Sequence, residues 1–424
     1  MKFTIRILSL ALTVTLLAAT LSSCLFLDSD FLTPIGSGAG ANISINDVNN
    51  YDIDIDAAED GSVIAASKAV LSVVSVTAAF RKTTPGIQGS SPSTSEATSY
   101  GSGVIYKLEK EKGNAYILTN YHVVYDSVIS SDINVYLYGQ EGDLYQDAFD
   151  GKYAIKATYV GGSMAYDLAL LKVENSTLLM QSDAVACTIA DSNDVPVLEA
   201  AIAVGNAKGK GISATMGRVN VDSEDITMLG PDNKTQISLR VMRTDAAVNN
   251  GNSGGGLFNS KGELIGIVNA KIIDSTVDNI GYAIPSNVAK YVSENILFYC
   301  DGKSSVNYVT RCILGINVMI KELYTEYDKE TGLVSKKEKV AISSIEQNSK
   351  VKNLLKEGDV INSITIDGQE YEVARMFHII DVMLNARVGK AVVFNVQRGS
   401  EKLDVSVDIT SDMLKNADDL LKKR

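Results

Sequence analysis

Several residue types on which other folds depend are rare in this chain. Its 424 residues include four cysteines, two histidines, six prolines and no tryptophan. The cysteines form no Cys-x-x-Cys pair and have no histidine at metal-ligand spacing, which argues against a disulfide framework and against a metal site. Cys300 and Cys312 could bridge or could remain buried free thiols, and the sequence leaves both states open.

Basic residues are missing from residues 25–62, which carry eight of the chain's carboxylates against a net charge of −12 for the whole chain. An acidic chain is poorly suited to a phosphate backbone, so we expect no nucleic-acid partner. Asp52, Asp54 and Asp56 alternate as in calcium loops, but the glycine and the glutamate that such loops need at positions six and twelve are lacking. We therefore interpret residues 25–62 as a solvated acidic tether.

The first residues have the pattern of a targeting segment. Lys2 and Arg6 precede an apolar run at residues 7–19, and residues 21–24 resemble the lipobox of bacterial lipoproteins. This pattern predicts a signal peptide at residues 1–24, with Cys24 lipidated as the mature N-terminus. An uncleaved transmembrane helix is the alternative, because apolar residues continue beyond the cysteine. Either form would attach the chain to a membrane, outside the cytoplasm.

Few prolines, 33 glycines and many β-branched residues favour short strands joined by glycine turns. We expect strands at residues 69–80, 103–106, 116–119, 133–138, 168–173, 200–204, 238–242 and 264–269. Such a density of strands indicates a sandwich or a pair of barrels. A helix predicted at residues 287–297 would close this first unit, which spans residues 63–300.

A polar stretch at residues 301–307 separates a second unit at residues 308–410. It combines strands predicted at residues 360–366 and 392–396 with apolar residues at helical spacing between residues 373 and 384. This mixture predicts a small α+β domain. The charged tail at residues 411–424 is expected to be a frayed helix.

Three residues suggest nucleophilic catalysis. His122 is one of only two histidines available as a general base near neutral pH. Asp167 begins a predicted strand, and Ser253 is surrounded by four glycines and an asparagine. A serine hydroxyl needs a base to take its proton, and the imidazole needs a carboxylate to hold its tautomer. His122, Asp167 and Ser253 are therefore our predicted catalytic residues.

The same serine segment predicts an oxyanion hole. A tetrahedral oxyanion is stabilised by preorganised backbone N–H groups, and a glycine before the nucleophile lets the backbone turn so that two of them converge. We expect the hole to consist of Gly251, Asn252 and Ser253, with the amides of Gly251 and Ser253 as the donor pair.

The order histidine, aspartate, serine and its flanking segments resemble the HtrA/Deg branch of the trypsin-like serine proteases. The resemblance covers about residues 63–300 and is carried by residues 119–124, 166–173 and 244–255. It implies a mainly β fold, with a chymotrypsin-like double β-barrel and the catalytic residues in its cleft. The family usually has proline at the positions of Asn250 and Gly256, which places the ordering of these loops in question and leaves the chemistry intact. We expect no cofactor and no metal ion.

The resemblance also suggests the specificity. The base of the primary pocket in trypsin-like folds lies six residues before the nucleophile, which is Ala247 here. Without a carboxylate at this position, cleavage after lysine or arginine is not expected, and the family implies a small aliphatic residue instead. Val268, Asn269 and Ala270 are expected to line the pocket and pair with extended substrate.

The second unit resembles a bacterial PDZ domain. Residues 312–316 are similar to the carboxylate-binding loop and the strand after it, so Ile313, Leu314, Gly315 and Ile316 are expected to bind peptide C-termini. The alternative is a generic α+β domain without peptide affinity. His378 lies on the helix beside this predicted groove and is expected to be a packed or surface residue.

Three functions remain compatible with the sequence. The first is an ATP-independent endopeptidase that degrades unfolded or misfolded envelope proteins. The second is a regulatory protease that cleaves one signalling partner, and the third is a chaperone or peptide-binding scaffold with an idle site. The family resemblance further implies a homotrimer formed through N-terminal contacts, for which Phe26, Phe31 and Tyr51 are the available aromatic anchors.

Overall fold

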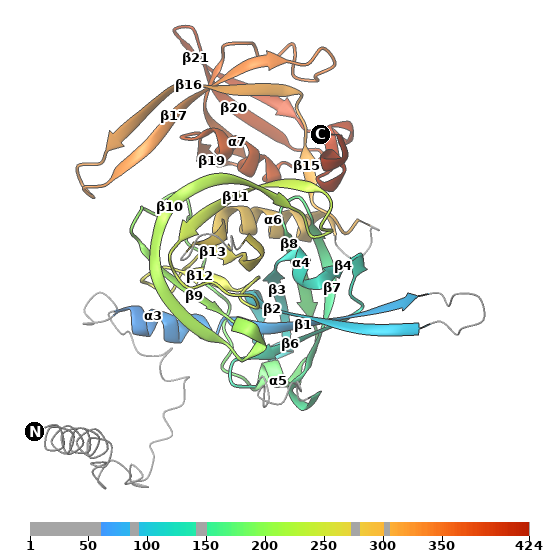
Figure 1. Ribbon diagram of the computed structural model, residues 1–424. Helices are drawn as coiled ribbons and strands as arrows, with labels where there is room; N and C mark the ends of the chain where they lie inside the picture. The colour runs from blue at the N-terminus through green and yellow to red at the C-terminus, as the bar shows by residue number, and fades with distance from the viewer. Residues whose placement is uncertain (1–60, 85–92, 141–150, 273–279, 301–305, 424) are drawn as a thin grey trace, which may run out of the picture. The chain divides into compact units, whose positions relative to one another are not determined.

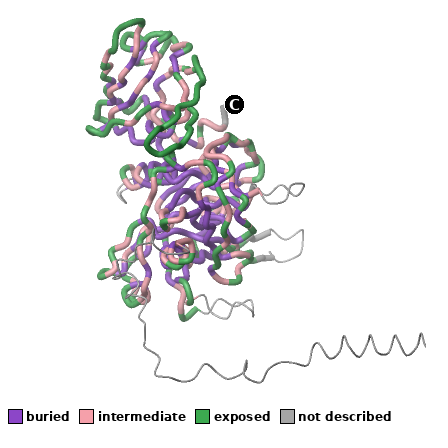
Figure 2. Tube along the Cα trace, turned by 90° about the vertical axis from the view of Figure 1, so that its left-hand side faces the viewer, coloured by how far each residue is buried: buried purple, intermediate pink, exposed green. Residues whose placement is uncertain are grey.

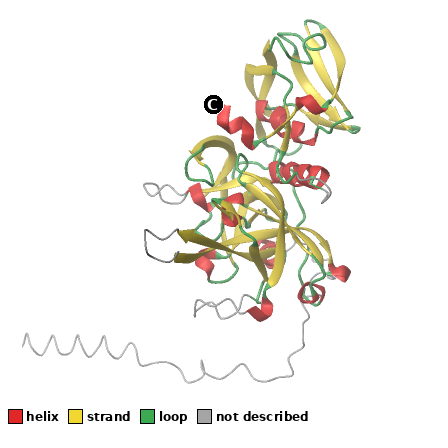
Figure 3. Cartoon of the chain, turned by 90° about the vertical axis from the view of Figure 1, so that its right-hand side faces the viewer, coloured by secondary structure: helices red, strands yellow, loops and turns green. Residues whose placement is uncertain are grey.

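The computed structural model describes residues 61–84, 93–140, 151–272, 280–300 and 306–423. The predicted leader, Cys24 and nearly all of the acidic tether lie outside these residues. In the described part of the chain, no helix has both the length and the apolar character needed to cross a membrane. Strands dominate the structure (Figure 3).

The first half of the protease-like region forms a closed six-stranded antiparallel barrel (Figure 1). In order around the barrel, its strands are β1 (Val73–Thr84), β2 (Ser93–Glu109), β3 (Asn114–Thr119), β8 (Leu168–Val173), β7 (Ile155–Ser163) and β6 (Asp132–Leu137). Alternate residues of a strand face the interior, and aliphatic side chains such as Val76, Ile117 and Leu171 fill it. The short elements α4 (Tyr121–Val124), β4 (Tyr125–Asp126) and β5 (Val128–Ile129) lie between β3 and β6, and α5 (Thr177–Met180) follows β8.

A second closed barrel follows. In order, its strands are β10 (Ser213–Leu229), β11 (Gln236–Thr244), β14 (Gly281–Pro285), β13 (Leu264–Val268), β12 (Gly256–Phe258) and β9 (Ala200–Gly205). One buried apolar cluster contains residues of both barrels, including Leu118 and Leu168 from the first and Ile202 and Ile267 from the second. This shared core joins the two barrels, and Figure 2 shows the buried residues concentrated in them. Burial on this scale is the main favourable term in folding.

Two helices pack on the barrels, α3 (Gly61–Val70) mainly on the second and α6 (Ser286–Tyr299) on both. α3 buries Ala65 and Ala69, and α6 buries Val288, Val292 and Ile296 on one face, in the same cluster. The apolar residues of α6 recur at spacings of four, as expected for an amphipathic helix. The double barrel predicted from the sequence is confirmed, and so is the helix predicted at residues 287–297.

The C-terminal unit is a separate sheet with its own core. β16 (Ile316–Tyr327), β17 (Val334–Ile345), β18 (Val360–Ile366), β20 (Ala391–Arg398) and β21 (Glu401–Asp408) are hydrogen-bonded in this order, and β19 (Gln369–Glu372) pairs with β18. α7 (Met376–Val382) packs on the sheet, with Phe394 and Ile364 fully buried. β15 (Thr310–Cys312) and β22 (Leu414–Asn416) form a further two-stranded pair.

Two predictions about local structure were wrong. The first strand starts at Val73 and not at residue 69, because residues 61–70 form α3; alanine is the strongest helix former, and three alanines stand in this stretch. The tail after Thr410 is not a frayed helix: Leu414–Asn416 forms β22, and a 3₁₀ segment, η10 (Asp418–Lys423), follows it. The prediction rested on the charged residues of the tail, which carry no information on its strand partner, β15, about a hundred residues earlier in the chain.

Candidate active site

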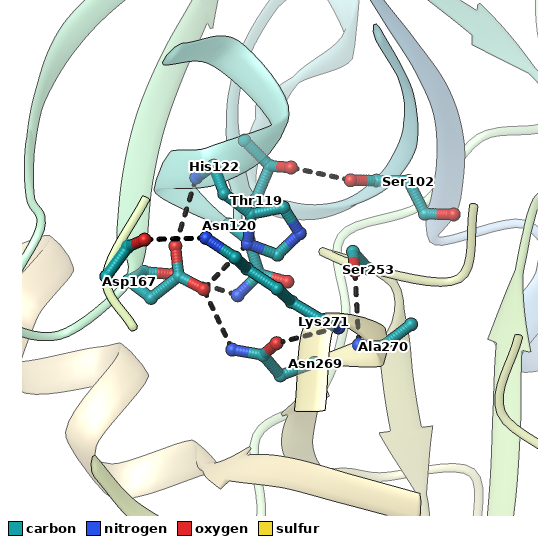
Figure 4. Close-up of polar contacts among 10 residues, drawn as sticks. Ser102, Thr119, Asn120, His122, Asp167, Ser253, Asn269, Ala270 and Lys271 are labelled. Atoms are coloured by element: carbon teal, nitrogen blue, oxygen red, sulfur yellow. Dashed lines mark hydrogen bonds and ion pairs between the residues drawn. The ribbon is translucent and has the colours of Figure 1, made fainter. Parts of the chain in front are cut away.

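His122 and Asp167 are in direct contact (Figure 4). His122 lies on α4, immediately after β3, and Asp167 immediately precedes β8, the strand beside β3 in the barrel. His122 Nδ1 lies 2.7 Å from Asp167 Oδ2, and the backbone N–H of His122 donates to Oδ1 over 3.0 Å. Because a carboxylate oxygen accepts, Nδ1 is assigned the proton and Nε2 is left as the acceptor. The imidazole is thereby held in one orientation, with Nε2 as its proton acceptor.

The backbone of Asp167 is also fixed. Its carbonyl accepts hydrogen bonds from Asn120 Nδ2 at 2.8 Å and from the backbone N–H of Tyr121 at 3.1 Å. Asp167 has a positive φ of 48° and its side chain is fully buried. A left-handed conformation of a residue other than glycine costs on the order of 1 kcal/mol and needs support from its surroundings.

Asn269 is a further contact of this carboxylate. Its Nδ2 donates to Asp167 Oδ2 over 2.8 Å, and its backbone N–H donates to Tyr282 O over 2.9 Å. The sequence placed Asn269 in the specificity pocket, but its side chain donates to the carboxylate of Asp167. A single asparagine after a strand carries no signal for this role, because the partner lies 102 residues earlier.

Ser253 lies at the other side of the histidine, in the loop before β12. The residue is 5% exposed, and its hydroxyl accepts a hydrogen bond from the backbone N–H of Ala270 over 3.1 Å. The structure describes both His122 and Ser253, and no hydrogen bond joins them in this arrangement. Catalytic hydrogen bonds are often long without substrate and shorten when the substrate complex forms.

The serine loop needs glycine for steric reasons. Gly251 and Gly254 have φ values of +97° and +84°. A Cβ on Gly251 would collide with the carbonyl oxygen of Asn206, and one on Gly254 with that of Ser102. The loop can therefore approach the neighbouring strands only without side chains at these positions.

Ser102 fastens this loop, a role that the sequence analysis missed. Its hydroxyl donates to Gly251 O and accepts from Asn206 N, both over 2.7 Å, and its N–H donates to Ser253 O over 2.8 Å. Asn252 N–H is engaged by Asn249 O at 2.9 Å. No hydrogen bond among the described residues uses the N–H of Gly251 or of Ser253, so both can donate to a ligand.

The predicted specificity residues lie around this centre. Ala247 is exposed, and its carbonyl accepts a hydrogen bond from Thr215 Oγ1 at 2.8 Å. Val268 is fully buried, and Ala270 contributes the N–H that contacts Ser253. The next residue, Lys271, donates from Nζ to Gly230 O over 2.6 Å, and burial lowers the pKa of its ammonium group.

A groove opens in the C-terminal unit beside residues 312–318. Its volume is about 360 Å³ and it is lined by the predicted peptide-binding residues Ile313, Leu314, Gly315 and Ile316 together with apolar residues of α7. The loop is anchored by Glu346 N donating to Gly315 O and by Ser349 Oγ donating to Leu314 O. β16 is the last strand of its sheet, so one of its edges has no strand partner among the described residues.

The remaining candidates are structural. Cys187, Cys300 and Cys312 form no disulfide in the described part of the chain, so the bridge between Cys300 and Cys312 is not formed. His378 is packed, with 7% of the residue exposed, and burial lowers its pKa to about 4. No group of histidine, cysteine or carboxylate side chains suited to a metal ion occurs in the described ranges.

Comparison with known proteins identifies relatives of this architecture. Residues 101–267 match the trypsin-like peptidase domain. The chain is 30% identical over 401 residues to "Serine protease Do-like HtrA" of Lactococcus lactis subsp. cremoris, covering 89% of this chain and 91% of the relative. It is 32% identical over 267 residues to "Periplasmic pH-dependent serine endoprotease DegQ" of Escherichia coli, covering 62% of this chain and 50% of that protein. The solved structure "HtrA-type protease AlgW with tripeptide" is 26% identical and has a TM-score of 0.50, covering 84% of this chain and 97% of that chain.

Proposed function

We propose a specific role for this chain, which belongs to the HtrA family of trypsin-like serine endopeptidases: it cleaves unfolded or misfolded proteins outside the cytoplasm, without ATP. The observation that carries the proposal is the 2.7 Å contact between His122 Nδ1 and the buried Asp167 carboxylate. This pair lies beside a serine in a glycine-rich loop, the arrangement that acyl transfer to a serine requires.

In the proposed reaction, substrate binding brings the Ser253 hydroxyl to His122. Nε2 of His122 takes the hydroxyl proton while Oγ attacks the scissile carbonyl, and the imidazolium then gives that proton to the leaving amine. Asp167 stabilises the imidazolium and holds its orientation. The amides of Gly251 and Ser253 would hold the oxyanion, and Asn252 holds the loop through its contact with Asn249.

The C-terminal unit is proposed to be a PDZ domain that binds peptide C-termini. The groove of about 360 Å³ beside Leu314 and Ile316 has apolar walls, and the unpaired edge of β16 can accept an extended peptide as an added strand. The solved relative named above contains a tripeptide, as its name states, and this agrees with the proposed role.

The resting geometry favours regulated activity as the second candidate. Ser253 Oγ is bonded by Ala270 N–H and not by His122, so the nucleophile must move before it can react. A protease that acts on one partner after peptide binding would use such a state, and so would a scaffold whose site stays idle. Turnover distinguishes the two: a protease should lose its activity when a proposed catalytic residue is replaced, whereas a scaffold has no activity to lose.

The attachment and assembly of the chain are also proposals. Lipidation at Cys24 would tether the enzyme to a membrane through the acidic segment, and the periplasmic location in the name of one relative supports an extracytoplasmic site. Family resemblance favours a homotrimer.

Casein hydrolysis tests the proposal most simply. The purified chain should degrade casein without ATP, and a hydrophobic peptide with a free C-terminus should change the rate. A Ser253→Ala variant should be inactive and should still bind the peptide. Equal casein cleavage by the parent and the variant would refute the assignment.

A further inference from the structure

The chain returns to the first barrel after it leaves the C-terminal sheet. Ala417 donates from its backbone N–H to Val309 O over 2.9 Å and is 1% exposed, within the cluster that contains Leu168. Leu421 packs against the buried side chains of β11. The tail that looked like a frayed end is therefore part of the protease core.

Asp418 lies at this point of return and binds a turn of the first barrel. Its Oδ1 accepts from Ser163 Oγ at 2.6 Å and from Ala165 N at 2.9 Å, and its Oδ2 accepts from Met164 N at 3.1 Å. One carboxylate thus receives a hydroxyl and two successive backbone N–H groups. Hydrogen bonds to an ionised acceptor are about twice as strong as neutral ones, and the residues joined here are 255 positions apart.

This turn leads directly to the catalytic carboxylate. The backbone N–H of Asp167 donates to Met164 O over 3.2 Å, so the turn capped by Asp418 ends on Asp167 itself. Asp167 has φ +48° and contacts His122 through its carboxylate. A shift of the turn would therefore move the carboxylate relative to the imidazole.

The opposite end of the same tail adjoins the peptide groove. β22 pairs with β15, with Asn416 opposite Thr310 and Leu414 opposite Cys312. Ile313, a groove residue, donates to Met413 O over 2.8 Å. A strand pair only three residues long thus connects the groove to Asp418, whose own N–H donates to Asn416 Oδ1.

We propose that Asp418 is a positioning residue for Asp167 and His122, and that β22 couples its position to peptide bound beside Ile313. The proposal rests on the catalytic residues proposed above. Asp418 touches no substrate; it fixes the turn at residues 163–165, and occupancy of the groove changes how firmly the turn is held.

The experiment compares full-length Asp418→Ala with Asp412→Asn as a control at a second carboxylate of the tail. Both remove one carboxylate from the tail, but Asp412 pairs with Lys350 and Thr410 in the C-terminal unit and does not contact the turn. Ser163→Ala is a milder second variant that removes one of the three hydrogen bonds and leaves the tail unchanged. Circular dichroism establishes that each variant is folded.

Two readouts separate positioning from general stability. With a short peptide substrate, Asp418→Ala should lower kcat about tenfold or more with little change in KM, since misplacement by about 1 Å can cost about 10²-fold in rate. Ser163→Ala should lower kcat less. Asp412→Asn should leave kcat unchanged. The proton NMR resonance of His122 Nδ1–H should shift in Asp418→Ala and stay in place in the control. This resonance is assigned to His122 by its disappearance in His122→Ala, because the chain has only two histidines.

Peptide coupling is measured on the same samples. A synthetic decapeptide with a C-terminal valine should move the His122 resonance in the parent and not in Asp418→Ala. Parental kcat and an unshifted resonance in folded Asp418→Ala would overturn the positioning role. Equal peptide responses in both proteins, or none in the parent, would overturn the coupling. An inactive parent would refute the proposed function instead, and the resonance would still report on Asp418.

Discussion

The side chain of Asn269 donates to Oδ2 of Asp167, the oxygen that also contacts His122 Nδ1. Two N–H groups from different barrels therefore share one carboxylate oxygen, at 2.8 Å and 2.7 Å. Asp167 and His122 belong to the first barrel, whereas Asn269 follows β13 of the second. The hydrogen bond links the pair of His122 and Asp167 to the second barrel.

Replacement of Asn269 by leucine should therefore slow the reaction. A hydrogen bond to a charged group contributes about 1.5–3 kcal/mol, so kcat should fall roughly tenfold to hundredfold. Asn220→Leu, an exposed change on β10, is the matched control. Steady-state kinetics of the parent, Asn269→Leu and Asn220→Leu test this prediction. Equal kcat values for Asn269→Leu and the control would contradict the role of Asn269.

Substitution of Gly251 by alanine should abolish turnover and leave the rest of the fold in place. The added methyl group collides with Asn206 O at a φ of +97°, so the loop must move away from Ser253. Gly389→Ala provides the control, because Gly389 also has a positive φ but has open space around it. Loss of activity in both variants alike would show that backbone strain, and not the collision, is responsible.

Burial of His378 should make the C-terminal unit sensitive to acid. Burial, with the nearby Arg240 and Arg375 guanidiniums, lowers its pKa from 6.5 to about 4. Between these values the unfolded chain binds a proton that the folded chain does not, so stability falls as pH drops from about 6.5 to about 4, by roughly 1.4 kcal/mol per pH unit. Denaturant titrations of the parent and His378→Gln should diverge in this window and run parallel above pH 7. Parallel curves throughout would contradict the account.

Lipidation at Cys24 is tested by mass spectrometry of the mature N-terminus from membranes. The expected species begins at Cys24 and carries acyl groups, because the basic and apolar leader precedes a lipobox-like segment. Cys24→Ser should release the enzyme from the membrane fraction or leave its leader uncleaved. An intact leader on the parent would instead support the transmembrane alternative.

The sequence alone was sufficient to predict those features that depend on residues close together in the chain. Ser253 was predicted from the glycines that its loop requires, and α6 from its apolar spacing. Contacts between distant segments were not accessible: Ser102 fastens a loop 149 residues later, and Asp418 binds a turn 255 residues earlier. A lone serine, asparagine or aspartate has many uses, and only the closed barrels determine which partner each one meets. The first strand was misplaced because packing of alanines on the second barrel favours a helix there.

The central claim is that Ser253, His122 and Asp167 act as one catalytic unit, and labelling by a fluorophosphonate probe combined with kinetics tests it most directly. The parent should be labelled at Ser253, and Ser253→Ala should not react. Ser253→Ala, His122→Ala and Asp167→Asn should each reduce turnover by roughly 10⁴-fold or more, and combining them should add little to the worst single change. Labelling elsewhere in the chain, or casein cleavage by pure Ser253→Ala at the parental rate, would contradict the account.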